Sequence, residues 1–252
     1  MSGMTSSSLS GKVVLITGAA KRIGAALARG FHAQGANVAI HYHRSAEAAE
    51  SLRDELNRTR ANSAISISAD LLNTARLPGI VDQVVGDFGQ FDVLINNAST
   101  FYPTPLGSIT STHWDDLIGT NLKAPLFLSQ AAAPHLRKAN GLIINIVDIH
   151  AQRPLPEHPV YVTAKAGLAM LTRSLARELG PEVRVNGIAP GPILWPDRGL
   201  DEGVKQEIIN KTLLKRTGEP DDIVRTALFF AKDAPYVTGQ ILAVDGGRSV
   251  GW

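Results

Sequence analysis

The stretch KVVLITGAAKRIG, residues 12–24, decides the fold. Its first half is a short run of apolar and β-branched residues, the pattern of a strand buried on both faces. A glycine-containing turn follows, and apolar residues then recur at helical spacing until Gly35. Glycines in such a unit let the backbone approach a pyrophosphate at the N-terminus of the helix. The residues predicted to bind the cofactor here are Gly18, Arg22, Ile23 and Gly24.

Alternating strand and helix patterns continue to the end of the chain. Strands are expected near residues 12–17, 37–42, 63–69, 91–96, 141–147, 183–188 and 240–244. Helices are expected near residues 23–35, 46–60, 77–88, 111–138, 161–179, 201–211 and 219–232, with Pro125 kinking the fourth. This alternation indicates parallel βαβ units. We predict a single α/β domain with a Rossmann-type, doubly wound parallel sheet.

The two ends of the predicted domain are set by composition. Residues 1–10 are rich in serine and lack an apolar core segment, so they are expected to form a flexible leader rather than a signal peptide. The domain then spans residues 11–252. Its Pro- and Gly-rich stretch at residues 192–203 predicts a substrate lid near residues 192–212.

Composition also restricts the possible function classes. The chain has 252 residues, 44% of them hydrophobic, which suits one domain with a sizeable core. A formal net charge of +2 with no basic stripe argues against nucleic-acid binding. There is no cysteine and no histidine spacing typical of a metal site. No apolar run reaches the roughly 18 residues that a membrane span needs. We expect a soluble cytoplasmic protein without a metal.

The second and third strands indicate which dinucleotide is bound. An enzyme that prefers NAD carries an acidic residue after the second strand, where it binds the ribose 2′-hydroxyl. This chain instead has His43-Arg44-Ser45, a cation with small donors that suits the 2′-phosphate of NADP. Asp70-Leu71 after the third strand is expected at the adenine. The structural alternatives are an ordinary basic loop with Ser45 capping the next helix, and a turn cap at Asp70.

Polar residues at the ends of the later strands and helices resemble the pattern of the short-chain dehydrogenases/reductases. The resemblance runs from about Lys12 to Asp245-Gly246-Gly247. Its motif residues are Asn97-Ala98, Asn121, Tyr161, Lys165 and Pro190-Gly191, with Ser99 beside the first pair. The resemblance implies that these residues bind the cofactor, except for Asn121, which is expected to hold a water that resupplies a proton. It also implies that Lys165 bonds the nicotinamide ribose.

Tyr161 and Lys165 are four residues apart on a predicted helix, so they share one face. A nearby ammonium and the charge of the oxidised nicotinamide should lower the pKa of the tyrosine toward the working pH. We therefore predict Tyr161 as the proton donor. Together with Lys165, Asn121 and Asp148, it makes up the predicted catalytic set.

Asp148 is the departure from the family pattern. The family has a serine thirteen residues before the tyrosine, where it steadies a substrate carbonyl, and this chain has Asp148 there. An ionised carboxylate cannot donate a hydrogen bond to a ketone oxygen, and it repels a developing oxyanion. It favours a proton-accepting group such as a ring nitrogen reduced across C=N. The alternative is that Asp148 is protonated or turned outward.

Arg22 in place of a glycine, His43-Arg44-Ser45, residues 96–105 and Asp148 together resemble the pteridine reductases. The resemblance implies an NADPH-dependent reductase of dihydropterins, with oxidised pterins and folates as further candidates, and the sequence does not rank these substrates. Phe101 could stack on a flat pterin, or simply anchor its loop. The predicted substrate-binding residues are Arg22, Ser99, Phe101, Asp148 and Tyr161, and Arg153 with residues 194–200 could set the substrate preference.

Two other functions remain open from the sequence. One is an NADPH-dependent carbonyl reductase of 3-oxoacyl thioesters or sugars, against which Asp148 argues. The other is a catalytically idle NADP-binding regulator, against which the complete set of Tyr161, Lys165 and Asn121 argues. The family resemblance further implies a homotetramer that pairs the helices near residues 111–138 and 161–179 and the segment ending at Trp252.

Overall fold

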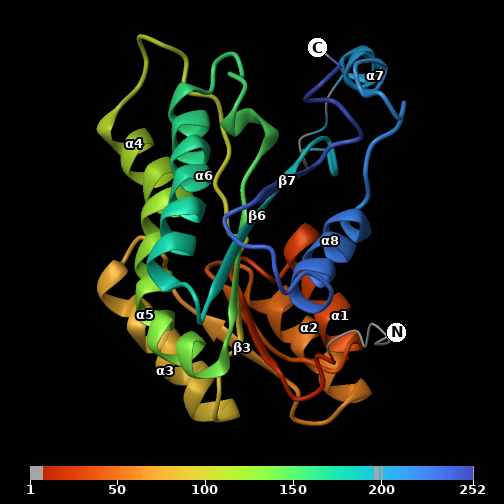
Figure 1. Ribbon diagram of the computed structural model, residues 1–252. Coiled ribbons are helices and arrows are strands. Elements are labelled where there is room, and N and C mark those ends of the chain that lie inside the picture. Colours follow the sequence, from red (N-terminus) through yellow and green to blue (C-terminus); the bar gives the residue numbers. More distant parts are fainter. Residues whose placement is uncertain (1–7, 196–198, 200, 252) are drawn as a thin grey trace.

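A computed structural model describes residues 8–195, 199 and 201–251. Within these residues, seven strands form one parallel sheet in the order β3-β2-β1-β4-β5-β6-β7 (Figure 1). The strands are β1 (Val13–Ile16), β2 (Asn37–Tyr42), β3 (Ala64–Ser68), β4 (Val93–Asn96), β5 (Leu142–Ile146), β6 (Arg184–Pro190) and β7 (Ile241–Val244). The predicted Rossmann-type sheet is confirmed.

Helices cover both faces of the sheet (Figure 1). Alternate side chains of β1 explain why, since Val14 and Ile16 pack into one hydrophobic cluster and Val13 and Leu15 into the other. All four are fully buried. One face holds α1 (Arg22–Ala33), α2 (Ala46–Thr59) and α8 (Pro220–Lys232), and the other holds α3 (Leu77–Phe88), α5 (Ala124–Ala139) and α6 (Pro159–Leu179).

The single long helix predicted at residues 111–138 is wrong in detail. The segment forms α4 (Ser111–Ile118), a π-helical turn η2 (Gly119–Lys123) and then α5. Pro125 does not kink a helix, because it lies in the first turn of α5, where no helical N–H partner is required. The π turn carries Asn121, whose side chain is bonded to a distant loop, and such turns are frequent at functional sites.

The described end of the predicted leader is packed rather than free. Residues 1–7 lie outside the described residues. Leu9 is only 4% exposed and belongs to the cluster under α1, and its carbonyl accepts a hydrogen bond from the Lys12 N–H. Leu9 therefore contributes to the core, because burying this leucine removes apolar surface from water.

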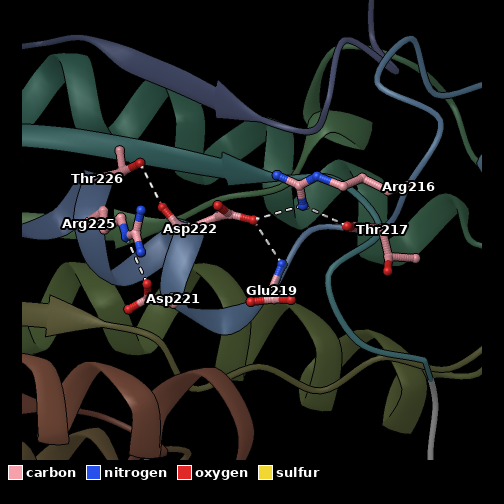
Figure 2. A network of polar contacts seen from close by, with 7 residues as sticks. All are labelled: Arg216, Thr217, Glu219, Asp221, Asp222, Arg225 and Thr226. Carbon is pink, nitrogen blue, oxygen red and sulfur yellow. Dashed lines mark hydrogen bonds and ion pairs between the residues drawn. The ribbon is translucent and has the colours of Figure 1, made fainter.

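One short helix after β6 lies within the region predicted as a lid. The helix α7 (Glu202–Asn210) stands apart from the sheet (Figure 1), and residues 196–198 and 200 of the predicted lid lie outside the described residues. The next helix, α8, begins at a capping box in which Asp222 accepts the Glu219 N–H. Figure 2 shows Arg216 reaching the same carboxylate, so the chain entering α8 is held in place.

Buried polar side chains join the centre of the sheet to α6. The Asn96 amide donates to the Asn145 Oδ1 over 2.8 Å, and the Asn145 amide donates to the Thr172 Oγ1 over 2.9 Å. These three residues are almost completely buried. Because buried polar groups are stable only when paired, this chain of bonds fixes α6 against β4 and β5.

Among the described residues, no helix is long and apolar enough to cross a membrane.

Candidate active site

A cleft of about 980 Å³ opens where the carboxyl ends of the strands meet the helices. Such a crevice is the usual ligand site of an open α/β sheet. Asn121 does not line it, since its side chain is fully buried behind the wall. All other side chains predicted to bind cofactor or substrate line the cleft: Gly18, Arg22, Ile23, Gly24, His43, Arg44, Ser45, Asp70, Leu71, Asn97, Ala98, Ser99, Phe101, Asp148, Tyr161, Lys165, Pro190 and Gly191.

The turn after β1 is fixed to the end of β4. The Thr17 Oγ1 accepts the N–H groups of Asn97 and Ala98, at 2.9 and 3.0 Å. The Asn97 side-chain amide in return donates to the carbonyls of Thr17 and Gly18, at 2.8 and 3.1 Å. Gly18 has φ +61°, and a Cβ there would lie 2.9 Å from the Ala98 Cα. The turn thus requires glycine for both its conformation and its close packing.

Gly24 and Arg22 shape the floor and the rim of the cleft. A Cβ on Gly24 would lie 2.3 Å from the Gly18 carbonyl oxygen, so the helix can approach the turn only with glycine there. Arg22 adopts φ 55°, a strained region for a non-glycine residue. Its guanidinium donates to the Trp195 carbonyl over 3.1 Å. Arg22 therefore spans the cleft from the turn to the chain that follows β6.

The far end of the cleft is lined by His43, Arg44 and Asp70. His43 and Asp70 are each about half exposed, and their side chains lie 4.0 Å apart. The Asp70 Oδ1 accepts the Leu72 N–H over 3.0 Å, so this aspartate caps its own turn as well as lining the cleft. Ser45 precedes α2 without a side-chain capping bond, which leaves its hydroxyl for the cleft. Together with Arg44, these groups can hold the adenosine end of a dinucleotide.

Tyr161 and Asp148 are in direct contact. The Tyr161 hydroxyl donates to the Asp148 Oδ2 over 2.7 Å, and the Asp148 Oδ1 accepts the His150 N–H over 2.8 Å. Asp148 is therefore turned toward the tyrosine, not outward. The buried Lys165 Nζ lies 5.7 Å from the centroid of the Tyr161 ring and donates to the Ile146 carbonyl over 2.9 Å.

The predicted lowering of the Tyr161 pKa is contradicted in this structure. Burial raises the pKa of Tyr161 well above its ordinary value, and the charge and hydrogen bond of Asp148 raise it further. A hydrogen bond with Ser99 works in the opposite direction. The physical reason is that the carboxylate touches the phenol, whereas the Lys165 ammonium is bonded to a carbonyl. Burial lowers the pKa of Lys165 to about 8, against the attraction of Asp148.

Asn121 supports the tyrosine through Ser99. Its Oδ1 accepts the Ser99 hydroxyl over 2.6 Å, and its amide donates to the carbonyls of Thr100 and Leu117, at 3.0 and 2.9 Å. Ser99 also lowers the pKa of Tyr161, so the Ser99–Asn121 pair lies beside the tyrosine hydroxyl. The role of Asn121 in holding a water stays a prediction.

Phe101 lies beside Tyr161 with half of its surface exposed. Its ring stacks on His158 at 4.7 Å between centroids, and it meets Tyr161 edge-on at 4.8 Å. A flat substrate can therefore stack only on the Phe101 face opposite His158. The histidine was not foreseen from the sequence, because it comes from the loop before α6 and no local pattern pairs it with residue 101.

Other residues of the cleft were also missed. His41 at the end of β2, Asp116 of α4, His150 and Arg248 all line it. Arg248 belongs to the segment after β7 and donates to the Ile208 carbonyl of α7 over 3.1 Å. In the sequence, the turn at residues 245–247 could have indicated that this segment returns to the carboxyl edge of the sheet. Arg153, in contrast, is not among the residues that line the cleft.

No group of three or more histidine, aspartate or glutamate side chains among the described residues could hold a metal ion.

A family model described as enoyl-(acyl carrier protein) reductase matches residues 18–249. This range is nearly the whole chain and includes all the predicted site residues. The chain belongs to the short-chain dehydrogenase/reductase family, whose members are oxidoreductases that bind NAD(P)(H).

Several curated relatives are similar over almost their full length. Pteridine reductase 1 of Leishmania tarentolae is 37% identical, covering 94% of this chain and 96% of the relative. The 3-oxoacyl-[acyl-carrier-protein] reductase FabG of Staphylococcus aureus strain Mu50 is 36% identical, covering 94% and 97%. The probable galactose dehydrogenase GalD of Rhizobium meliloti is 37% identical, covering 93% of each. Overall sequence identity therefore does not show whether the substrate is a pterin, a thioester or a sugar.

Replacing Asp148 by asparagine should lower the pKa of Tyr161. The change keeps the size of the side chain and removes the negative charge that disfavours the phenolate, while burial still holds the pKa above its ordinary value. Phenolate absorbance followed at alkaline pH measures this, with Tyr161→Phe identifying the signal among the four tyrosines. A pKa that is unchanged or raised in Asp148→Asn would show that the carboxylate does not control the phenol.

Proposed function

We propose that the protein reduces C=N bonds of pterins with NADPH, with dihydropterins as the main substrates. The observation that carries this proposal is the 2.7 Å hydrogen bond from the Tyr161 hydroxyl to the Asp148 carboxylate. A phenol paired with a carboxylate suits the protonation of a ring nitrogen. It does not suit a ketone, whose developing oxyanion the carboxylate would repel. The pteridine reductase among the relatives supports the same choice.

NADPH, when bound, supplies the hydride that the carbon of the C=N bond accepts. The neighbouring nitrogen then holds the electron pair of the former double bond and is a strong base, so the Tyr161 hydroxyl can give it the one proton it needs even though the pKa of the tyrosine is raised. Asp148 holds the hydroxyl in place and stabilises positive charge on the ring as the nitrogen is protonated. Ser99 and Asn121, which are hydrogen-bonded to each other over 2.6 Å, lie beside the same hydroxyl and offer polar groups through which a proton can return.

The cleft fits a dinucleotide phosphorylated on its ribose. Gly18 and Gly24 keep the turn free of Cβ atoms where a pyrophosphate would approach, and the N-terminus of α1 faces this turn. Arg44, His43 and Ser45 line the far end, where a 2′-phosphate would need a cation. These residues support NADPH rather than NADH as the cofactor.

Arg44→Asp should reverse part of this preference. Losing a cation and gaining an anion beside the 2′-phosphate should raise the KM for NADPH by about 30-fold or more, while a new carboxylate can bind the ribose hydroxyl of NADH. Arg58→Asp makes the same change of charge on an exposed face of α2 outside the cleft, and should leave both KM values unchanged. Equal KM values for NADPH in the two variants would argue against the assigned phosphate site.

The substrate class is decided by NADPH oxidation with dihydrobiopterin, biopterin, folate and an acetoacetyl thioester, and by NADP+ reduction with galactose. We expect turnover of the pterins, and a loss of about 100-fold in kcat/KM when Asp148 is replaced by serine. Asp82→Ser, at an exposed position of α3, should behave as the unaltered protein.

Turnover of the thioester alone would overturn the proposal and identify a carbonyl reductase, which the FabG relative makes the main rival. Binding of NADPH without turnover of any of the five compounds would instead favour a regulator that has kept the fold.

We also propose a homotetramer, because large apolar side chains are exposed on the helices that the family resemblance places in contacts between subunits. Trp114, Phe127 and Met170 lie on α4, α5 and α6, and Val250 on the C-terminal segment. Light scattering should give about four times the 26.9 kDa mass of the chain. Met170→Glu should reduce that mass, whereas Leu106→Glu, at an exposed loop position, should not. A monomer mass for the unaltered protein would refute this assembly.

A further inference from the structure

His41 is a buried histidine at the end of β2 that touches two neighbouring segments of the cleft. Only 1% of it is exposed. The Gly18 N–H donates to its Nδ1 over 3.2 Å, and its Nε2 lies 3.2 Å from the Ala69 carbonyl oxygen. The imidazole thus joins the turn after β1 to the end of β3, across the width of its own strand.

The two partners allow only one state of the ring. A backbone N–H can only donate and a carbonyl can only accept, so Nδ1 must be unprotonated and Nε2 must carry the hydrogen. Burial, with a smaller contribution from His43, lowers the pKa of His41 to about 4, against the Ala69 hydrogen bond and the attraction of Asp70. The ring is therefore neutral at pH 7. A protonated ring would point an N–H at the Gly18 N–H.

The main chain of His41 acts on the same turn. Its carbonyl accepts the Ala19 N–H over 2.8 Å, so His41 takes both N–H groups at the start of the turn. The Asn97 side-chain amide donates to the carbonyls of Thr17 and Gly18, as described above. The N–H groups that can meet a phosphate are therefore those after Ala19, toward the N-terminus of α1.

We propose that His41 is a positioning residue for the cofactor: its imidazole holds the turn at Gly18 and the chain at Ala69 in the arrangement that receives the dinucleotide. The acceptor at Nδ1 fixes which amides point into the cleft. The donor at Nε2 fixes the chain that leads into Asp70. This inference rests on the family's binding of NAD(P)(H), and it holds whichever substrate the cleft takes.

Two substitutions separate the two bonds of the ring. In His41→Phe both bonds are lost, and a buried N–H without an acceptor is costly. We expect the Kd and KM for NADPH to rise about tenfold or more, with kcat at saturating NADPH within about twofold. In His41→Asn the Oδ1 occupies the place of Nδ1 and can again accept the Gly18 N–H. We expect this variant to recover to within about threefold of the unaltered protein.

His32→Phe is the matched control for a merely structural effect. His32 is also a buried histidine, 6% exposed, with its Nε2 2.7 Å from the Ser63 Oγ, but it lies on α1 outside the cleft. Both phenylalanine variants should melt at a lower temperature, and only His41→Phe should lose affinity for NADPH. An equal loss in the two variants, or no rescue in His41→Asn, would overturn the proposal.

The state of the ring provides a readout that needs neither substrate nor turnover. Nitrogen-15 spectra of the histidine rings at pH 7 should show His41 neutral with its hydrogen on Nε2, assigned by the signal missing from His41→Phe. A ring that is charged, or protonated on Nδ1, would refute the arrangement. Because NADPH binding is measured directly, a failure of the pterin assignment would leave this result unaffected.

Discussion

The hydrogen bonds between Thr17 and the Asn97-Ala98 pair are the constraint on which the cleft depends. Strand order reverses between β1 and β4, so the chains leaving these two neighbouring strands turn to opposite faces and would separate. The Thr17 hydroxyl and the Asn97 side-chain amide hold the two chains together there with four hydrogen bonds. Every other group of the site is positioned relative to this junction: His41 bonds the turn on one side, and Ser99 continues the chain toward Tyr161 on the other.

The fold could be predicted because each strand and helix is specified by a short, continuous stretch of sequence. Strands such as Val13–Ile16 are continuous apolar runs, and helices alternate with the strands along the chain, which leaves a parallel sheet as the consistent arrangement. The break between α4 and α5 could not be predicted in the same way. It depends on Asn121 bonding Ser99 and Thr100, which are some twenty residues away in the sequence. A periodicity taken from one segment carries no information about such a partner.

The composition of the site was predictable for a topological reason, and its electrostatics were not. Motif residues follow the ends of parallel strands, and these ends share one edge of the sheet, so the fold alone gathers them. Burial raises the pKa of Tyr161, and the charged group that reaches the hydroxyl then raises it further or opposes that rise. Asp148 reaches it and Lys165 does not, a difference of side-chain orientation that spacing along a helix does not contain. The His158 partner of Phe101 was missed for the same reason.

The π turn at Gly119–Lys123 fixes the number of residues that the segment from α4 to α5 can contain. Each residue of an α-helix advances the chain by about 100° around the axis, so removing one residue here would rotate α4 by that amount relative to α5. Leu117, which is fully buried, would leave the core, and Asn121 would lose its place beside Ser99. A single deletion within this helical segment would therefore disturb both the core and the side chains beside Tyr161.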